Sequence, residues 1–334
     1  MPAVPPPIAI LQMIGGYWIS RMLYVAAELG VADLIHERPR PASELADATG
    51  MHSRALYRVL RALAGVGVFT EDESGNFHLT PVGAALRSNA PGSMRAMVLS
   101  ELAGEHFDAW TNLAQSVKTG EIAFDHKYSK DVWAYYAENP ARAAIFNESM
   151  TNVSEATNAA VVAAYDFSSI QKLIDVAGGH GSLLAGILGA NPHLKGVLFD
   201  QPHVVNGATA KLATLADRCE VVGGNMFEEV PSGADAYLMK WIIHDWDDEH
   251  SLTILKNIHR AMTENGKLLL VEMVVPPGND MDFSKLLDIN MLVMTGGCER
   301  TEAEYAALLN NAGFKLTRIL PTQGPASIIE AVRV

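Results

Sequence analysis

Apolar and polar positions in the first hundred residues follow the spacing of helices, and then that of two short strands. A largely apolar helical pattern covers residues 8–35, and the helical period is seen in residues 19–35, ISRMLYVAAELGVADLI. Two shorter helices are predicted at 41–50 and 53–68. Gly50 is a typical helix end, and Ser53 is a candidate N-cap. Residues 68–80, VFTEDESGNFHLT, predict a hairpin that turns at Ser-Gly-Asn.

From about residue 170 the pattern changes. Residues 105–165 are still helical, but short apolar runs then alternate with helix-like segments, as in QKLIDVAGGHGSLLAGILGANP, GVLFDQP and GKLLLVEMV. Strands that alternate with helices form a mostly parallel sheet with helices on both faces. We therefore predict an α/β protein in three parts: a helical domain (1–104), connecting helices (105–165) and an α/β domain (166–334).

The two helices and the hairpin resemble a winged helix-turn-helix, which often binds DNA. The second helix carries Arg54, Arg58 and Arg61. Against a DNA role, residues 40–90 hold five basic and five acidic side chains, contain no lysine and have an acidic wing tip. A dimerisation or lid module is therefore favoured, with DNA binding as the alternative.

Composition and charge narrow the classes of partner. The chain has 334 residues, of which 49% are hydrophobic, and a formal net charge of −13, which disfavours nucleic acid. Its two cysteines form neither a CxxC pair nor a disulfide framework. No positive side chain precedes Arg21, unlike in a signal peptide, and no uninterrupted apolar run approaches ~18 residues. We expect a cytoplasmic protein with no membrane segment and no nucleic-acid partner.

Acids and glycines gather where the first two strands of the α/β domain end. Asp175 precedes the turn Ala-Gly-Gly-His-Gly, and Asp200 follows 25 residues later. The turn has neither GxGxxG spacing nor a following GK[ST], which disfavours a pyrophosphate or triphosphate. An acid before the turn suits a cationic ligand, and a carboxylate such as Asp200 can accept both hydroxyls of a ribose. S-adenosylmethionine fits these features, while a turn acid before Pro202 is the alternative for Asp200.

Six stretches, in order, resemble the plant caffeate-type and bacterial small-molecule O-methyltransferases. They are LIDVAGGHG, GVLFDQPHV, VVGGNMFEEVP, YLMKWIIHDWDDEHSLTILKNIHRAM, NGKLLLVEMV and GGCERTEAEYAALLNNAGF, and the likeness extends to the helical N-terminal domain. The resemblance implies a Rossmann-like class I methyltransferase domain and a homodimer intertwined through a winged-helix dimerisation domain. It implies that S-adenosylmethionine contacts eight residues: Asp175, Gly179 and Gly181 at the methionine part, Asp200 at the ribose, Asn225, Met226 and Phe227 at the adenine, and Lys240 near ribose and adenine.

Two positions depart from the family pattern. Ala177 stands where the family's turn usually begins with glycine, and Asn225 replaces the aspartate of the usual GGDMF. The amide oxygen of Asn225 can still accept a hydrogen bond from the adenine amino group. We therefore expect altered cofactor affinity, not its loss.

The stretch WIIHDWDDEH (241–250) has three interpretations: a metal cluster, a helix start or a catalytic base. His244 and His250 are six residues apart, a spacing that suits no shared ion on a helix or strand. The acids at 247–249 precede a helical pattern, where they complement the helix dipole. His244 closes an apolar strand at the ligand edge of the sheet, which favours a base over a satisfied core histidine. We predict no metal.

A base at this position fits methyl transfer to a phenol. The acceptor must be aligned with the S–CH3 bond, and ionising a phenol of pKa ~10 at pH 7 costs ~4 kcal/mol. A neutral imidazole can take that proton, so activity is expected to rise through a pKa near that of histidine. Carboxylates that orient the ring would assist, and the resemblance gives this role to Glu272 and Glu299. Plain strand-edge and helix-capping acids are the alternatives.

The acceptor pocket is assigned by resemblance. Its side chains come from the helices before the first strand and from DINMLVMTGG: Trp110, Phe146, Asn147, Met150, Asn290, Met291 and Met294. Methionines pack adaptably on flat aromatic ligands, with ordinary core methionines as the alternative. The pattern does not choose among phenols, naphthoates, anthracyclines and phenazines.

Together these features predict a homodimeric, metal-independent methyltransferase that acts on a hydroxyl of a small aromatic secondary metabolite. One alternative is an N-methyltransferase for a nitrogen heterocycle such as a phenazine, which has less need of a histidine base. The other is a DNA-binding regulator that uses the winged helix.

Overall fold

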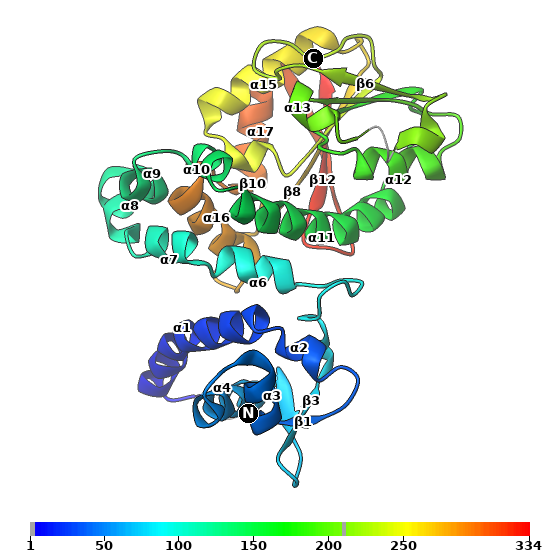
Figure 1. The fold of residues 1–334 in the computed structure, drawn as a ribbon. Helices are drawn as coiled ribbons and strands as arrows, with labels where there is room; N and C mark the ends of the chain where they lie inside the picture. The colour runs from blue at the N-terminus through cyan, green and yellow to red at the C-terminus, as the bar shows by residue number, and fades with distance from the viewer. Residues whose placement is uncertain (1–3, 209–211) are drawn as a thin grey trace. The chain divides into compact units, whose positions relative to one another are not determined.

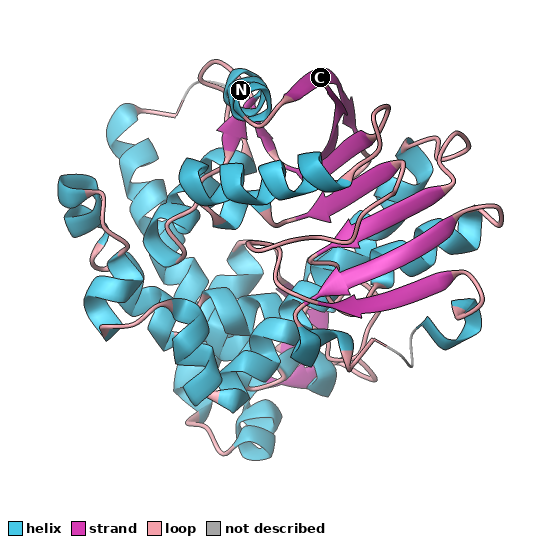
Figure 2. Cartoon of the chain, turned by 90° about the horizontal axis from the view of Figure 1, so that it is seen from above, coloured by secondary structure: helices cyan, strands magenta, loops and turns pink. Residues whose placement is uncertain are grey.

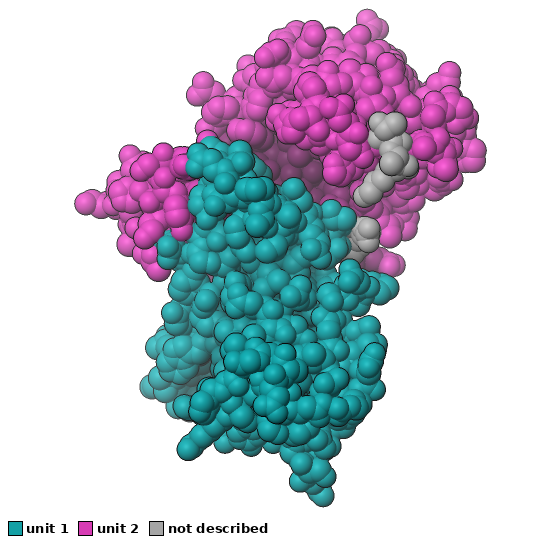
Figure 3. All heavy atoms as spheres, in the orientation of Figure 1, with its two compact units in different colours: residues 1–108, 133–153 teal, residues 109–132, 154–334 magenta. Residues whose placement is uncertain are grey.

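The computed structural model describes residues 4–208 and 212–334, and the chain divides into two compact units. One unit holds residues 1–108 and 133–153, and the other holds 109–132 and 154–334 (Figure 3). The chain therefore leaves the first unit and returns to it once before completing the second. The sequence-based boundaries at 104 and 165 stay predictions.

The first unit combines short helices with a three-stranded antiparallel sheet. Its helices include α1 (Pro6–Glu28), α2 (Val31–Leu34), α3 (Ala42–Thr49), α4 (Ser53–Gly65), α5 (Pro81–Ala84) and α6 (Arg95–Glu101). Its strands pair in the order β1 (Arg40–Pro41), β3 (Asn76–Leu79) and β2 (Phe69–Glu71). Three helices cross the boundary between the units: α7 (Gly104–Trp110), α10 (Val132–Glu138) and α11 (Pro140–Ala164). The core is apolar and includes Leu45, Leu60, Leu63, Phe69 and Phe77.

Local turn and cap signals predicted several of these elements. The hairpin at 68–80 is confirmed by the antiparallel pairing of β2 with β3. Gly50 ends α3 with a left-handed φ of 71°, as predicted. The N-cap of α4 is His52 and not Ser53, because the His52 ring accepts the Ala55 N–H at 3.4 Å.

Helix α1 begins at Pro6, close to residue 8, where the helical pattern was predicted to start. It ends at Glu28 and does not continue to residue 35, because Gly30 adopts a left-handed φ of 64° that starts a new helix. Among the residues described, α1 alone is long and apolar enough to cross a membrane, which is weak evidence for a membrane segment. Its first half exposes large apolar side chains: Ile8, Ile10, Leu11, Met13, Ile14, Tyr17 and Trp18.

The second unit is built on a seven-stranded sheet (Figures 1 and 2). The strands lie in the order β11 (Phe314–Pro321), β12 (Ser327–Arg333), β8 (Lys267–Glu272), β7 (Ala236–Lys240), β4 (Lys172–Val176), β5 (Lys195–Asp200) and β6 (Cys219–Gly223). The five strands from β8 to β6 are parallel, and β11 and β12 are antiparallel. The predicted α/β fold is confirmed.

Alternate strand residues pack against helices on opposite faces of this sheet. Ile174 and Val176 lie in a core with α15 (Asp248–Ala261) and α17 (Glu302–Asn311), whereas Leu173 packs with α11 and α12 (Ser182–Ala190). The remaining elements of the unit are α8 (Leu113–Thr119), α9 (Ala123–Tyr128), α13 (Pro202–Val205), α16 (Phe283–Met294), the 3-10 turns η1 (Ala213–Leu215) and η2 (Ile243–Asp245), and the parallel pair β9 (Val274–Val275) and β10 (Arg300–Thr301).

The strand order creates a place for a ligand. From β4 the chain adds β5 and β6 on one side and later β7 and β8 on the other. In such sheets, loops on either side of this switch point diverge and leave a crevice beyond the carboxyl ends of the strands. The five parallel strands end there at Val176, Asp200, Gly223, Lys240 and Glu272.

Candidate active site

The turn after β4 is left-handed at three positions and is bonded to the end of β5. Ala177, Gly179 and Gly181 have φ values of 57°, 59° and 75°. Only the alanine is strained, because a Cβ disfavours this region by ~1–2 kcal/mol, which explains why glycine is usual there. Asp200 accepts the Gly179 N–H at 2.8 Å and the Gln201 N–H at 2.6 Å, each through a different oxygen. Both oxygens retain a lone pair for a ligand.

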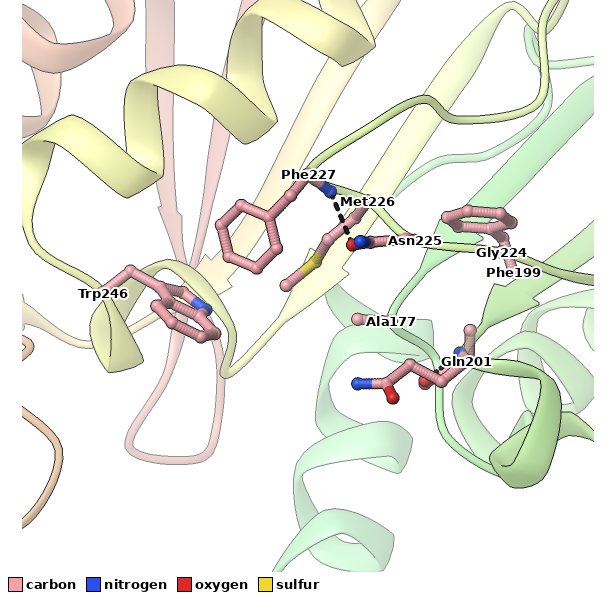
Figure 4. Close-up of a pocket in the computed structure, with 9 residues that line it drawn as sticks. Ala177, Phe199, Gln201, Gly224, Asn225, Met226, Phe227 and Trp246 are labelled. Carbon is pink, nitrogen blue, oxygen red and sulfur yellow. Dashed lines mark hydrogen bonds between the residues drawn. The ribbon is translucent and has the colours of Figure 1, made fainter. Parts of the chain in front are cut away.

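A cavity of about 120 Å³ opens beside this turn. Its lining is Ala177, Phe199, Asp200, Gln201, Gly224, Asn225, Met226, Phe227 and Trp246 (Figure 4). The Phe227 and Trp246 rings meet edge to face with centroids 4.8 Å apart, and Asn225 accepts the Phe227 N–H at 3.0 Å. Apolar walls beside a carboxylate suit a nucleoside. The cavity brings together four residues that the sequence predicted for the cofactor: Asp200, Asn225, Met226 and Phe227.

Asp175 and Lys240 place opposite charges at the ends of β4 and β7. Asp175 is 2% exposed, and its Oδ2 has no hydrogen-bond partner among the described residues. Burial raises the pKa of Asp175 to about 7 although Lys240 opposes the shift, and burial lowers the pKa of Lys240 to about 8. Lys240 donates to Asn158 at 2.6 Å, and Asn158 donates to Ser182 at 3.0 Å. The bare oxygen of Asp175 suits a cationic or N–H group of a ligand.

His244 lies in η2, directly after β7, and is 8% exposed. Its Nδ1 lies 2.7 Å from Oε1 of Glu299, which leaves Nε2 for another proton. Burial lowers the pKa of His244, but three nearby carboxylates outweigh burial and raise it to about 10: those of Asp245, Glu272 and Glu299. The pKa of His244 is therefore raised above that of an ordinary histidine, which favours the protonated ring in the free protein.

Glu272, at the end of β8, contacts the main chain and not the ring. Its Oε1 accepts the N–H groups of Ile242 at 3.1 Å and Ile243 at 2.9 Å. Its Oε2 has no partner among the described residues, and burial raises the pKa of Glu272 to about 7. Of the two acids predicted to orient the imidazole, Glu299 is hydrogen-bonded to it, whereas Glu272 fixes the backbone just before it.

The acidic run after His244 begins a helix, as the sequence predicted. Asp247 is the N-cap of α15 and accepts the His250 N–H at 2.9 Å, and Asp248 pairs with Arg300 at 2.7 Å. Within 4–208 and 212–334, no group of three or more His, Cys, Asp or Glu side chains is placed to hold a metal. Whether activity requires a metal stays a prediction.

The residues predicted to line the acceptor pocket are divided between the two units. In the second unit, the Trp110 indole N–H donates to Oδ1 of Asn290 at 2.9 Å. Met291 and Met294, on the same helix α16, are buried, as ordinary core methionines also are. Three more lie on the part of α11 that belongs to the first unit: Phe146, Asn147 and Met150. Their role in a pocket stays a prediction.

Sequence reasoning missed several residues of this site. Trp246 lines the cavity, and its position two residues after His244 is the signal that could have found it. Asn158 bonds to Lys240, which is 82 residues away in the sequence, and Arg300 bonds to Ile243, which is 57 residues away. No local sequence pattern predicts contacts over such separations. Gly297 is also required by a distant contact, since a Cβ there would lie 2.0 Å from the His244 carbonyl oxygen.

Comparisons with known proteins agree over nearly the whole chain. Residues 110–315 match the model of an O-methyltransferase domain, and residues 11–89 match that of an O-methyltransferase dimerisation domain. The phenazine O-methyltransferase PhzM of Lysobacter antibioticus is 46% identical over 98% of this chain and 97% of its own length. A phenazine-1-carboxylate N-methyltransferase of Pseudomonas aeruginosa is 32% identical over 97% of this chain and 96% of its own length.

A solved structure shares the fold. CalO1, a methyltransferase in calicheamicin biosynthesis in its SAH-bound form, superposes with a TM-score of 0.90 at 36% identity. The match covers 99% of this chain and 100% of that chain.

Proposed function

This chain belongs to the O-methyltransferase family, and from that premise we propose that it transfers the methyl group of S-adenosylmethionine to a hydroxyl of a small aromatic natural product. The match of residues 11–89 to the dimerisation domain supports a homodimer. The observation that carries the choice of a hydroxyl is the buried pair of His244 and Glu299, 2.7 Å apart at the carboxyl edge of the sheet.

The cofactor fits the residues at this edge. Asp200 holds the ribose hydroxyls, and the cavity between Met226, Phe227 and Trp246 takes the adenine. The bare oxygen of Asp175 receives the positively charged methionine part. When bound, S-adenosylmethionine supplies a methyl group activated by a sulfonium. The SAH-bound form of CalO1 supports the choice of this cofactor.

His244 acts as the general base. Its Nε2 takes the proton of the acceptor hydroxyl, while Glu299 fixes the ring through Nδ1 and stabilises the imidazolium that results. Because nearby carboxylates raise the pKa of His244 to about 10, the neutral ring is a minority form of the free protein at pH 7. A positive charge bound beside the ring lowers the pKa of an imidazole and so favours the form that accepts a proton.

A hydroxyl on a fused aromatic ring system, such as a hydroxyphenazine, is the proposed acceptor. The 46% identity to a phenazine O-methyltransferase supports this class. N-methylation is the second candidate, and the 32% identity to a phenazine-1-carboxylate N-methyltransferase favours it less. A ring nitrogen with a free lone pair needs no base, so a histidine held by a carboxylate argues for oxygen.

The test uses the purified protein with S-adenosylmethionine carrying a 13C-labelled methyl group. The acceptors are a hydroxyphenazine, phenazine-1-carboxylate, a dihydroxynaphthoate and catechol, and products are identified by mass spectrometry and carbon NMR. We expect an O-methyl product from the hydroxyphenazine. An N-methyl product would establish the second candidate, and no product from any acceptor despite cofactor binding would refute methylation of this aromatic class.

A further inference from the structure

Arg300 is almost completely buried beside the turn that carries His244, and all of its donors are used. It is 2% exposed. Nη1 donates to the carbonyls of Ile243 at 3.1 Å and Cys298 at 3.5 Å, and Nη2 donates to the carbonyl of Trp246 at 3.0 Å. Nε and Nη2 both reach Oδ1 of Asp248, at 3.1 and 2.7 Å. The guanidinium therefore joins the residues on both sides of His244.

The residues directly before Arg300 also contact His244 itself. Glu299 holds Nδ1 of the imidazole, and the backbone of Gly297 lies so close to the His244 carbonyl that a Cβ would be 2.0 Å from its oxygen. β10, which contains Arg300, is in turn paired with β9 beyond the end of β8. Residues 297–300 thus contact both the main chain of the turn that carries His244 and the imidazole of His244, and they hold the two in place together.

The turn needs these contacts from residues 297–300 because its own backbone is strained. Trp241 has a φ of 56°, a left-handed conformation that a bulky L residue rarely adopts. Strained conformations persist only where the surroundings determine them. Glu272 holds the N–H groups of Ile242 and Ile243 from one side, and Arg300 holds the carbonyls of the turn from the other.

We propose that Arg300 is a positioning residue for His244, which it holds at the reacting hydroxyl by fixing the main chain of the turn. This inference rests on the proposed role of His244 as the base. Arginine suits the task because its planar fork presents five donors in fixed directions, whereas lysine presents three at one point. A displacement of ~1 Å at a reacting group can reduce turnover ~100-fold, so a small loosening of the turn is measurable.

The test compares Arg300→Lys with Arg218→Lys in the full-length protein. Arg218 is a matched control because it also donates to three main-chain carbonyls, those of Leu188, Asn191 and Leu194, but at the amino ends of the strands. With a hydroxyphenazine as acceptor, we expect Arg300→Lys to lower kcat about 10–100-fold. The Kd for S-adenosylmethionine should change by less than about threefold, and Arg218→Lys should leave kcat unchanged.

A double-mutant cycle separates positioning from general damage. In a His244→Ala background, Arg300→Lys should lower kcat by less than about threefold, because no ring remains to be placed. An equal loss in both backgrounds would reduce Arg300 to a structural residue and overturn the proposal. Asp248→Ala removes an exposed partner of the guanidinium, so it tests the same point with little risk to folding. We expect it to lower kcat about 3–10-fold, and we expect this loss to disappear in the His244→Ala background.

Nitrogen-15 NMR of labelled histidines keeps this test independent of turnover. The proton between His244 and Glu299 should give a downfield signal that His244→Ala removes. Arg300→Lys should shift or abolish that signal, and Arg218→Lys should not. If His244→Ala retains full turnover, the base assignment fails while the NMR result still decides whether Arg300 holds the ring. An unchanged signal in Arg300→Lys refutes the positioning role.

Discussion

At the scale of single residues, His244 is surrounded by more negative charge than one base needs. Glu299 is hydrogen-bonded to the ring, and Asp245 and Glu272 act through their charges. A single carboxylate is sufficient to orient an imidazole, and the additional charges raise the pKa of the ring. We therefore expect the protonation of His244, and not only its placement, to affect the rate at neutral pH.

Replacing His244 by alanine should lower the turnover of a phenolic acceptor by about 10²–10⁴-fold, the usual contribution of a positioned base. Acidic phenols should lose less, because they ionise without help. The Kd for S-adenosylmethionine should be nearly unchanged, as calorimetry can establish. His36→Ala, at an exposed position, is the control. Full turnover by the His244 variant would exclude proton abstraction by this ring.

The pH dependence should follow the raised pKa of His244. In the proposed mechanism the neutral ring accepts the proton, so turnover should rise as the pH increases, through an apparent pKa above the ordinary 6.5 of histidine. Glu299→Gln removes one charge that stabilises the imidazolium. The rise should then move to lower pH while the maximum falls, and kcat measured from pH 6 to 10 tests both effects. A profile that does not move would contradict the charge assignment.

Asp200→Ala should weaken S-adenosylmethionine binding by ~2–3 kcal/mol, the value of charge-assisted hydrogen bonds to the ribose. The same side chain accepts the Gly179 N–H, so part of the loss comes from a loosened turn. Asp200→Asn keeps an acceptor for that N–H and should lose less. Calorimetry decides, with the exposed Asp217→Ala as control. Unchanged affinity in a folded Asp200→Ala would place the ribose elsewhere.

At the scale of elements, the sequence predicted structure wherever the determining chemistry is local. Gly50 ended α3 and the Ser-Gly-Asn turn closed the β2–β3 hairpin, because each depends on its own backbone conformation. The cap of α4 was misassigned, since a histidine ring does what the adjacent Ser53 was expected to do. The break after α1 was missed because Gly30 lies within an otherwise continuous apolar pattern.

The exposed half of α1 gives the prediction at this scale. Ile10 and Ile14 are 57% and 48% exposed, and apolar surface of this kind usually marks an interface. Ile10→Glu together with Ile14→Glu should turn the dimer into monomers in sedimentation velocity, because two charges per copy would be buried. The control is Val82→Glu, at 62% exposure in the same unit. A double variant that stays dimeric would place the interface elsewhere.

At the scale of the whole molecule, alternating apolar runs were sufficient to predict the α/β class and to place Asp175, Asp200 and His244 at the carboxyl edge. They could not predict Arg300 or Asn158, whose contacts join segments far apart in the chain. Nor could they predict that Glu272 would bond to backbone and not to the ring, since both arrangements have the same sequence. The local sequence pattern therefore predicts which residues lie at the carboxyl edge of the sheet, whereas tertiary packing determines the hydrogen bonds that they form there.

Activity of the whole protein should survive millimolar chelator. Asp247 caps α15 and Asp248 pairs with Arg300, so the acidic run has other partners than a metal ion. Turnover measured before and after dialysis against EDTA should agree. A loss that magnesium restores would show that a metal takes part.

The position of β12 has a consequence for how this protein is made. It is synthesised after every other strand described, yet it lies between β11 and β8 and pairs Ser327 with Glu272. Until the ribosome has released residues 327–333, the Leu- and Val-rich β8 has an open edge, which is the kind of surface that aggregates. The strand that carries Glu272 is therefore completed only after β12 has been made, so a nascent chain stalled before residue 327 should engage chaperones and have no activity.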